Sequence, residues 1–420
     1  GRRPSFRALA IDRLPLFLAA WQGLASPGGA EEDLRQRLDQ LLGYPAPAEA
    51  WEKEILPARL APYRTAWLDS LMQTSGLIWF GCGHRRIGFA FPDDLELFRD
   101  RADSAGEAAV AADYITPDRI NDLFPGRIGR YSLLEIARHA AIDSRAAAEK
   151  LWSLAWQGLV TNDGFAAVRQ GVLTDFAPLD VRTEPGRPSR SAYNRWAATR
   201  PLMGSWYAIV AEGSERDPID EAELVKDRAR QLLGRYGILF REILAAELPP
   251  LQWARTFRAL RLMELSGEIL SGYFFAGIPG VQFISPEAFR LLQEPLPEDS
   301  LFWLNAADPA SLCGVRLEGL KGGLPSRLPS THLVYRGSRP ALISSRNGGT
   351  LEFLTGPEDP RLADVLGFFM VLLTRQFNPR KRILVERING GPAADSAYAK
   401  PLQAFGFTRY PQGLELHRKF

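Results

Sequence analysis

Residues 132–161 read Ser-Leu-Leu-Glu-Ile-Ala-Arg-His-Ala-Ala-Ile-Asp-Ser-Arg-Ala-Ala-Ala-Glu-Lys-Leu-Trp-Ser-Leu-Ala-Trp-Gln-Gly-Leu-Val-Thr. Apolar side chains recur there at the i, i+3, i+4 spacing of a helix face, which predicts two short amphipathic helices. They are Leu133, Ile136 and Ala137, then Ala147, Leu151 and Leu154. Asp143 or Ser144 can cap the second helix, and Gly158 can end it because glycine tolerates the left-handed conformation. The stretch therefore predicts a helix-turn-helix followed by a hairpin.

The same helix end recurs at Gly76 and Gly267. In all three places a large apolar residue stands four positions before the glycine (Met72, Leu154, Met263), and a β-branched residue stands two positions after it (Ile78, Val160, Ile269). Chance similarity among helix ends is the alternative, but the matching upstream helices favour repetition. Repeats of a helix-turn-helix with a β-wing are typical of winged-helix modules.

These repeats predict a mainly α fold with β wings, in which tandem winged-helix modules precede a C-terminal mixed α/β domain. A chain of 420 residues is long enough for several such domains. We expect winged helices at 1–92, 93–180 and 203–295, with an Arg/Pro-rich connector at 181–202. Short strands and one apolar helix predict the last domain, at 296–420.

Composition argues against several kinds of site. The two cysteines, Cys82 and Cys313, lie far apart, and the four histidines are scattered, so we expect no metal and no cofactor. No apolar run reaches the ~18–20 residues of a membrane span. The basic N-terminus leads into no long apolar run with a cleavage site, so a secretory signal is not expected.

The positive charge is mostly arginine. The net charge is only +2, but 44 of the 51 basic residues are arginine. Its planar fork of donors fits phosphate groups and guanine edges. A GC-rich genome would give the same bias, so the composition permits nucleic-acid binding without requiring it.

Six stretches, in consistent order from about residue 50 to the C-terminus, resemble the C-terminal region of bacterial Lhr-type (large helicase-related) DNA helicases. They are Trp51-Glu-Lys-Glu-Ile-Leu-Pro-Ala-Arg-Leu, the stretch 151–163, Arg235-Tyr-Gly-Ile-Leu-Phe-Arg-Glu, Gly272-Tyr-Phe-Phe-Ala-Gly-Ile-Pro-Gly-Val-Gln-Phe, Asn305-Ala-Ala-Asp-Pro and Glu386-Arg-Ile-Asn-Gly.

The resemblance implies tandem winged helices followed by a β-barrel-like domain, joined to an N-terminal superfamily 2 helicase motor in the same polypeptide. It also implies a bacterial, cytoplasmic and nucleoid-associated DNA repair protein. Its partner would be single-stranded or duplex DNA, or an RNA:DNA hybrid. This sequence contains no Gly-x-x-x-x-Gly-Lys-Ser/Thr loop and no Asp-Glu-x-His box, so we expect no ATPase activity within it.

Three groups of basic residues are candidates for nucleic-acid contact. The first group, at a hairpin tip, is His84, Arg85 and Arg86. The second, on the recognition helix of the third module, is Arg255, Arg258 and Arg261. The third, in the connector, is Arg187, Arg190 and Arg195, interleaved with Tyr193 and Trp196. Wing and recognition-helix arginines commonly contact phosphates or grooves, and aromatic residues among arginines are typical of single-strand contacts. The alternative for the hairpin tip and the helix is an ordinary solvated surface, and the alternative for the connector is a linker without a binding role.

A second function is suggested by the fold. Winged-helix arrays with a β-rich domain resemble the AlkZ-type DNA glycosylases, which need a carboxylate or amide beside the sugar. Gln282-Phe283-Ile284 begins like their Gln-apolar-Gln/Asp motif, although Ile284 replaces the polar third residue.

Asp308 is the predicted catalytic carboxylate, with an ordinary Asp-Pro turn as the alternative. On the catalytic hypothesis, Asp308→Asn should leave folding nearly intact. A third class of function is a scaffold for protein interaction or homo-oligomerisation.

Overall fold

The computed structural model describes residues 6–99, 120, 122–126, 128–177, 203–209, 217–320 and 323–418. An N-terminal segment with η1 (Ile11–Arg13) and α1 (Leu14–Trp21) precedes the first module. That module contains α2 (Glu31–Leu41), β1 (Ala46–Pro47), η2 (Trp51–Ile55), α3 (Leu56–Arg59), α4 (Thr65–Ser75), β2 (Ile78–Gly81) and β3 (Arg86–Ala90). Two short helices follow it, η3 (Pro92–Asp94) and α5 (Leu95–Phe98).

The third module repeats this order of elements, whereas in the second a helix separates the two paired strands. The second contains α7 (Leu133–His139), α8 (Ser144–Trp156), β4 (Val160–Asn162), α9 (Ala166–Leu173) and β5 (Trp206–Ala208). The third contains α11 (Pro218–Tyr236), β6 (Ile238–Leu239), η5 (Ile243–Ala246), η6 (Pro249–Leu251), α12 (Trp253–Leu265), β7 (Leu270–Gly272) and β8 (Gln282–Ile284), followed by α13 (Pro286–Gln293).

Each module has the sheet of a winged helix. The strand orders are β1-β3-β2 and β6-β8-β7, and in the second module Trp206 of β5 bridges Tyr131 while β5 pairs with β4. The recognition helices α4, α8 and α12 are followed by glycines with φ of 75° (Gly76), 71° (Gly158) and 80° (Gly267). The three predicted helix ends are therefore confirmed, because each glycine adopts the left-handed conformation.

One expected division differs in the structure. The repeats predict that residues 206–208 belong to the third module, but in the structure β5 pairs with β4 of the second. Trp206 is fully buried there between Trp79 and Trp152, at ring-centroid distances of 6.0 and 5.2 Å. Local periodicity could not show this pairing, because residues 163–205 separate the two strands.

The C-terminal domain is mixed α/β, as predicted. Its elements are β9 (Leu301–Asn305), η7 (Glu318–Leu320), β10 (His332–Arg336), β11 (Arg339–Ser345), η8 (Arg346–Gly348), β12 (Thr350–Phe353), α14 (Leu362–Thr374), β13 (Arg382–Val385), β14 (Arg387–Ile388), β15 (Gly391–Pro392), η9 (Ala393–Asp395), α15 (Ala399–Phe405), β16 (Thr408–Tyr410) and β17 (Gly413–His417).

Two sheets form this domain, with strand orders β15-β14-β12-β11-β10-β9 and β13-β17-β16. The described residues contain no pairing that closes either sheet, so the barrel-like form is not confirmed. The apolar helix α14 packs on β9 and β10 and supplies much of the core, including Leu366, Phe369 and Leu373.

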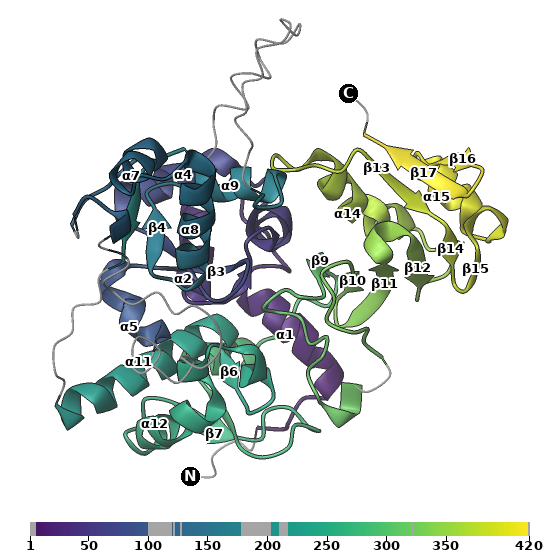
Figure 1. Ribbon diagram of the computed structural model, residues 1–420. Helices are drawn as coiled ribbons and strands as arrows, with labels where there is room; N and C mark the ends of the chain where they lie inside the picture. Colours follow the sequence, from purple (N-terminus) through teal and green to yellow (C-terminus); the bar gives the residue numbers. More distant parts are fainter. Residues whose placement is uncertain are drawn as a thin grey trace, which may run out of the picture.

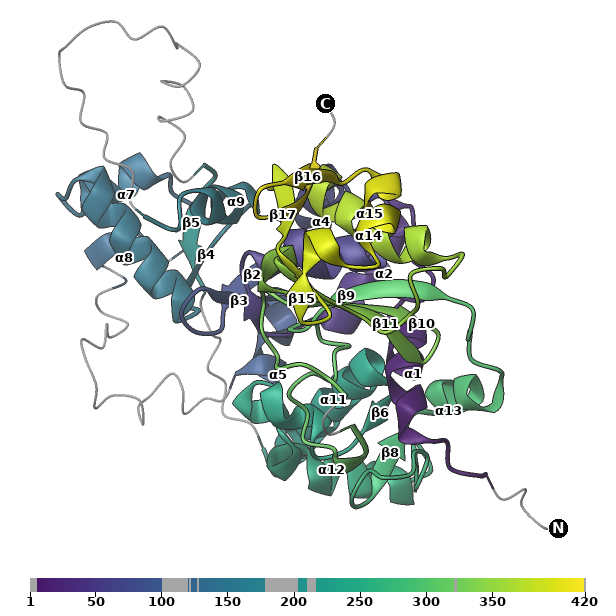
Figure 2. The same ribbon diagram turned by 90° about the vertical axis from the view of Figure 1, so that its right-hand side faces the viewer.

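The modules and the C-terminal domain surround α1 (Figure 1, Figure 2). Trp21 at the end of α1 donates its indole N–H to the carbonyl of Gly234 in α11 at 2.8 Å. Upstream, Leu9 forms a parallel bridge with Phe275 in the wing of the third module. The N-terminal segment therefore braces the third module, although it lies in sequence beside the first. Within the described ranges, no helix is long and apolar enough to cross a membrane.

Candidate nucleic-acid interface

The recognition helix of the first module is held by its neighbours near its N-terminus. At its N-terminus, the backbone N–H and hydroxyl of Thr65 donate to Oε1 of Gln376, at 2.7 and 3.1 Å. One turn later, both oxygens of Asp69 accept from Arg169 of α9 at 2.8 Å. The same guanidinium contacts the buried Glu52 at 2.6 and 2.9 Å. Helix α4 thus joins the second module to the C-terminal domain. Its N-terminal turn is covered by the side chains of Gln376 and Arg169.

The first wing is docked on the second module. The N–H of Gly83 donates to the carbonyl of Trp156 at 3.0 Å, and the ring of His84 lies 6.4 Å from that of Trp156. Arg85 donates to the side chain and the carbonyl of Asp175, at 2.6 and 2.7 Å, and its guanidinium lies 5.5 Å from the ring centroid of Phe176. His84 and Arg85 therefore contact the second module, although His84 is exposed and the Arg85 side chain is 42% exposed.

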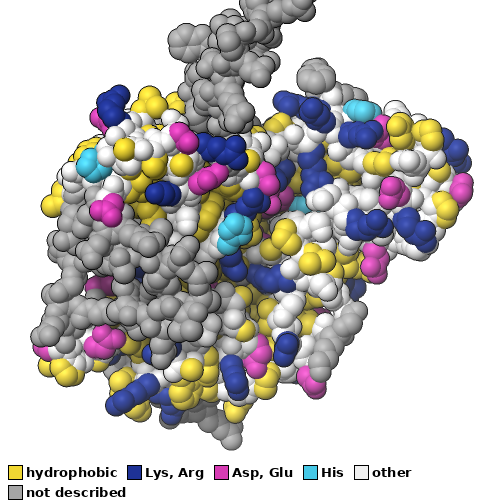
Figure 3. Space-filling model, in the orientation of Figure 1, with side chains coloured by type: hydrophobic (Ala, Val, Ile, Leu, Met, Phe, Trp, Pro, Cys, Tyr) yellow, Lys and Arg dark blue, Asp and Glu magenta, His cyan; other side chains and the backbone are white. Residues whose placement is uncertain are grey.

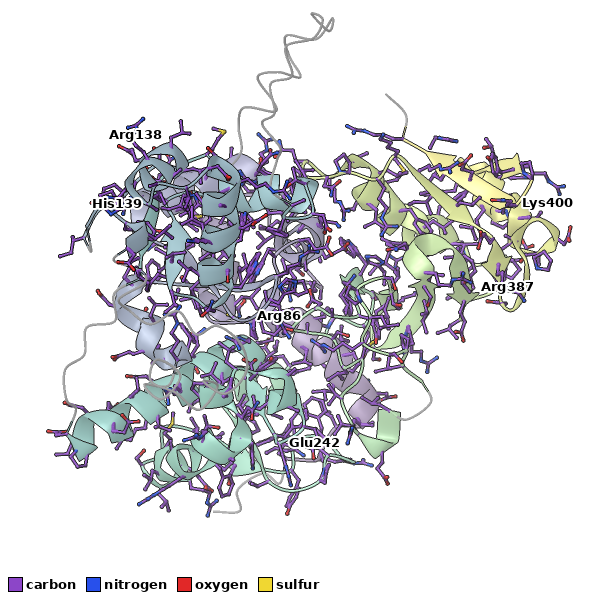
Figure 4. All side chains as sticks on the ribbon, in the orientation of Figure 1. Arg86, Arg138, His139, Glu242, Arg387 and Lys400 are labelled. Carbon is purple, nitrogen blue, oxygen red and sulfur yellow. The ribbon has the colours of Figure 1, made fainter. Side chains whose placement is uncertain are left out.

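Arg86 has a different setting from its neighbour. Its side chain is exposed and donates one hydrogen bond of 2.6 Å to the carbonyl of Pro45. Lys and Arg side chains gather near the centre of the face in Figure 3, in the region where Figure 4 labels Arg86. The contact of Arg86 with a phosphate remains a prediction.

The recognition helix of the third module presents a basic surface. Its buried side consists of Thr256, Ala259, Leu260 and Met263. Arg255, Arg258 and Arg261 all lie on the exposed side, as the spacing predicted. Arg261 pairs with Glu264, whereas Arg258 has no ion pair or hydrogen bond with any residue in the described ranges. Arg258 is therefore available to a phosphate or a base edge without loss of an existing contact.

Gln282 organises the wing beside this helix. Its side-chain oxygen accepts from the N–H groups of Phe274 and Phe275 at 2.9 Å, and its amide donates to the carbonyl of Phe275 at 2.8 Å. The side chain is fully buried, so these three bonds satisfy most of its hydrogen-bonding capacity. The geometry makes Gln282 a positioning residue for the wing backbone. Its proposed catalytic role remains a prediction.

Asp308 lies in a separate buried network and shares no bonding partner with Gln282. Its two oxygens accept from Arg59 at 2.7 Å each, and Oδ1 also accepts from the N–H of Ala310 at 2.8 Å. Arg59 further donates to Gln22 and to the carbonyl of Ile55. Because neither Asp308 nor Arg59 has an exposed side chain, the carboxylate reaches no surface in this conformation. Its catalytic role also remains a prediction, but its observed role is to tie the segment after β9 to the first module.

A carboxylate that sequence analysis did not single out lines a small pocket. Glu242 precedes η5, and its Oε2 is buried without a hydrogen-bond partner among the described residues. The pocket has a volume of about 60 Å³ and lies between η5 and the segment after β9. Its wall combines Tyr236, Ile243, Pro309, Cys313, Val315 and Arg327.

Glu242 ends the quoted stretch Arg235-Tyr-Gly-Ile-Leu-Phe-Arg-Glu, but an acidic residue between Arg241 and Ile243 has no pattern that marks a catalytic carboxylate.

The connector arginines Arg187, Arg190 and Arg195 lie outside the described residues. Within the described ranges, no cluster of three or more His, Cys, Asp or Glu side chains could hold a metal ion.

Comparisons with known proteins agree with this architecture. A family profile described as "Large helicase-related protein, winged-helix domain" matches residues 11–90, and another with the same description matches residues 218–302. The chain is 27% identical over 441 residues to "Lhr helicase/uracil glycosylase" of Escherichia coli, covering 97% of this chain and 27% of that protein. It is 29% identical over 444 residues to "Lhr helicase/ probable uracil glycosylase" of Mycolicibacterium smegmatis, covering 99% of this chain and 29% of that protein.

The chain thus resembles a region of Lhr-type helicases and spans little more than a quarter of these relatives. Among solved structures, the DNA glycosylase AlkZ of Streptomyces sahachiroi has a similar fold, with a TM-score of 0.52 and 12% identity over 86% of this chain and 96% of that one.

Proposed function

We propose that this chain is the DNA-binding region of an Lhr-type repair helicase, and that α12 with its wing is its main contact surface. The observation that carries the proposal is the exposed arginine face of α12, with Arg258 unpaired among the described residues. The corresponding helix α4 has its N-terminal turn covered by Gln376 and Arg169.

The proposal includes a motor elsewhere in the full polypeptide, since the relatives are named helicases and this chain matches only part of each. The proposal places the full protein in the bacterial cytoplasm, in association with the nucleoid. The test is a fluorescence-anisotropy titration of labelled DNA at several salt concentrations. Binding through phosphates gives a log affinity that falls linearly with log salt, with a slope of about −0.9 per phosphate on duplex DNA. Affinity that does not depend on salt would contradict the proposal.

We also propose, as a second activity, excision of a damaged base such as uracil. Both curated relatives carry glycosylase in their names, and their similarity runs over nearly all of this chain. Glu242 supplies a carboxylate with an unsatisfied oxygen at a pocket, which the reaction requires.

In such a reaction the C1′–N bond breaks, the sugar develops positive charge, and water adds its oxygen to C1′ while the departing base gains a proton. A nearby carboxylate stabilises the positive charge and accepts a proton from the attacking water. The pocket is smaller than the roughly 150 Å³ cavity that accommodates a six-membered ring. A base would therefore enter only after the pocket rim moves.

The assay for this activity is incubation of the chain with single-stranded DNA that contains uracil, in the presence of a chelator, followed by alkali. Strand cleavage at the uracil position is the expected result. Intact DNA would leave the binding proposal standing alone.

A further inference from the structure

We infer that one small inorganic anion, such as chloride, binds where α1 meets the first module, held by Gln22, Arg37 and Arg59. This inference is independent of the proposed DNA-binding function. It assigns a ligand to a cluster of side chains that neither proposed activity uses.

Three buried N–H groups at this junction have no hydrogen-bond partner among the described residues. They are Nε2 of Gln22, Nε of Arg37 and Nε of Arg59. The side chains of Gln22 and Arg59 are fully buried. Native proteins leave few buried donors unsatisfied, so such groups indicate a bound water molecule or ion.

The three side chains come from different helices but form one cluster. Gln22 follows the last residue of α1, Arg37 lies in α2 and Arg59 ends α3. The guanidinium of Arg59 donates to Oε1 of Gln22 at 2.7 Å. The guanidinium of Arg37 lies against Gly23, so closely that a Cβ on this residue would collide with it. Both guanidinium groups are therefore next to the end of α1.

The cluster contains a cation without a matching negative charge. Arg59 is paired with Asp308, whose two oxygens accept from it at 2.7 Å each. Arg37 donates instead to the neutral side chain of Gln40 at 2.9 Å, and it forms no ion pair with a carboxylate in the described ranges. Burial and the nearby charge of Arg59 lower the pKa of Arg37, and Asp33 only partly opposes them. A bound anion would offset the cost of this half-buried charge.

An anion fits these groups better than water does. All three unpaired atoms are hydrogen-bond donors, so the missing ligand must be an acceptor. A water molecule accepts at most two hydrogen bonds and brings no charge. A halide accepts from several directions at once and supplies the negative charge that the pairing of Arg59 with Asp308 leaves missing.

The test measures urea unfolding of the full chain, without DNA, in mixtures of sodium chloride and sodium gluconate at constant sodium concentration. Gluconate is too large to enter a buried cluster. Once chloride exceeds its dissociation constant, the ratio of folded to unfolded chain should rise about tenfold for each tenfold increase in chloride. A ratio that does not respond to chloride overturns the inference.

Two arginines of α2 provide a matched pair of variants. Arg37→Met removes the charge but keeps an unbranched stem against Gly23, so it should fold and lose the response to chloride. Arg35→Met changes an exposed arginine of the same helix and should keep the response of the parent. The line width of the chloride NMR signal reports binding directly. The excess width that the parent produces should disappear in Arg37→Met and remain in Arg35→Met.

Gln22→Glu separates an anion site from a purely structural role of these side chains. The carboxylate of this variant would place the missing acceptor and the missing negative charge inside the cluster. The variant should therefore be more stable than the parent in gluconate, and chloride should no longer stabilise it. A parental response to chloride in Arg37→Met or in Gln22→Glu overturns the inference, because the anion then acts elsewhere on the chain.

Discussion

Both oxygens of Asp308 accept hydrogen bonds of 2.7 Å from the guanidinium of Arg59, although the two residues are 249 positions apart in the chain. Neither side chain is exposed to solvent. The pair joins the end of α3 in the first module to the segment after β9 in the C-terminal domain. An aspartate that reads as a turn former before proline is therefore also half of a fully buried ion pair.

Replacing this aspartate should destabilise the fold. Asp308→Asn removes the charge that compensates Arg59, and loss of one partner of a buried pair costs about 3–5 kcal/mol. A urea unfolding curve of the variant against the parent measures this difference. The combined change of Arg59→Met with Asp308→Leu should recover most of the loss, since no buried charge is then left unpaired. A variant Asp308→Asn with parental stability would mean that the pair contributes nothing.

The arginines of α12 should dominate the salt dependence of DNA binding. Changing Arg255, Arg258 and Arg261 together to Ala should reduce the slope on duplex DNA by about two to three phosphate contacts. Anisotropy at several salt concentrations gives this slope. Arg290→Ala is the matched control, because Arg290 is an exposed arginine on α13 that pairs with Glu287. If both variants keep the parental slope, α12 faces away from the DNA.

The two arginines of the first wing should behave differently from each other. The sequence alone predicts that both contact phosphates. In the structure Arg85 is paired with the carboxylate of Asp175, whereas Arg86 donates only to a carbonyl, that of Pro45, among the side-chain contacts of the described residues. Arg86→Ala should lower DNA affinity and reduce the slope by about one contact, while Arg85→Ala should leave both unchanged.

A small loss of stability is expected in Arg85→Ala, since an exposed pair contributes about 0–1 kcal/mol. Equal effects of the two substitutions on DNA affinity would show that the first wing leaves the second module to bind DNA.

Acid should weaken the contact between the first module and the C-terminal domain. Glu54 accepts from His332 at 2.8 Å and from Arg375 at 3.2 Å. Burial raises the pKa of Glu54, but His332, Arg375 and the nearby Arg380 bring it below its ordinary value of 4.5. A depressed carboxylate pKa gives stability that is present above the ordinary value and is lost as the pH falls through the folded-state value.

Urea midpoints of the parent and of Glu54→Gln should therefore differ at neutral pH and converge between about pH 5 and pH 3. Glu287→Gln, at an exposed pair on α13, serves as the control and should show no such convergence. If the difference in urea midpoint between the parent and Glu54→Gln stays constant down to acid pH, ionisation of Glu54 is not the cause of that difference.

Base excision, if the uracil assay detects it, should depend on Glu242. Glu242→Gln preserves the shape of the side chain and removes its charge, so the rate should fall by about 10²–10⁴-fold while DNA affinity stays close to that of the parent. Single-turnover cleavage of uracil-containing DNA measures the rate. Glu294→Gln, an exposed change just after α13, is the control. Parental cleavage by Glu242→Gln would remove this residue from the mechanism.

The parts of this structure that could be predicted from sequence are those governed by local patterns. The three helix ends at Gly76, Gly158 and Gly267 follow from helical spacing and from the tolerance of glycine for positive φ. The exposed side of α12 follows from the same spacing. Arg85 and Asp308 could not be placed this way, because their partners Asp175 and Arg59 are distant in sequence. Glu242 could not be predicted from sequence, because its distinguishing property is a buried carboxylate oxygen without a hydrogen-bond partner among the described residues. That property exists only in the folded chain.

The pairing of β4 with β5 has a consequence for how this protein is made. Trp206 leaves the ribosome long after Asn162, so the sheet of the second module stays incomplete while the intervening residues 163–205 are synthesised. A gene fragment that stops near residue 180 would lack Trp206, whose ring contacts Trp79 and Trp152. It would also lack β5, which lies between β4 and Tyr131 in the sheet. Expression boundaries for the first two modules therefore belong beyond residue 209.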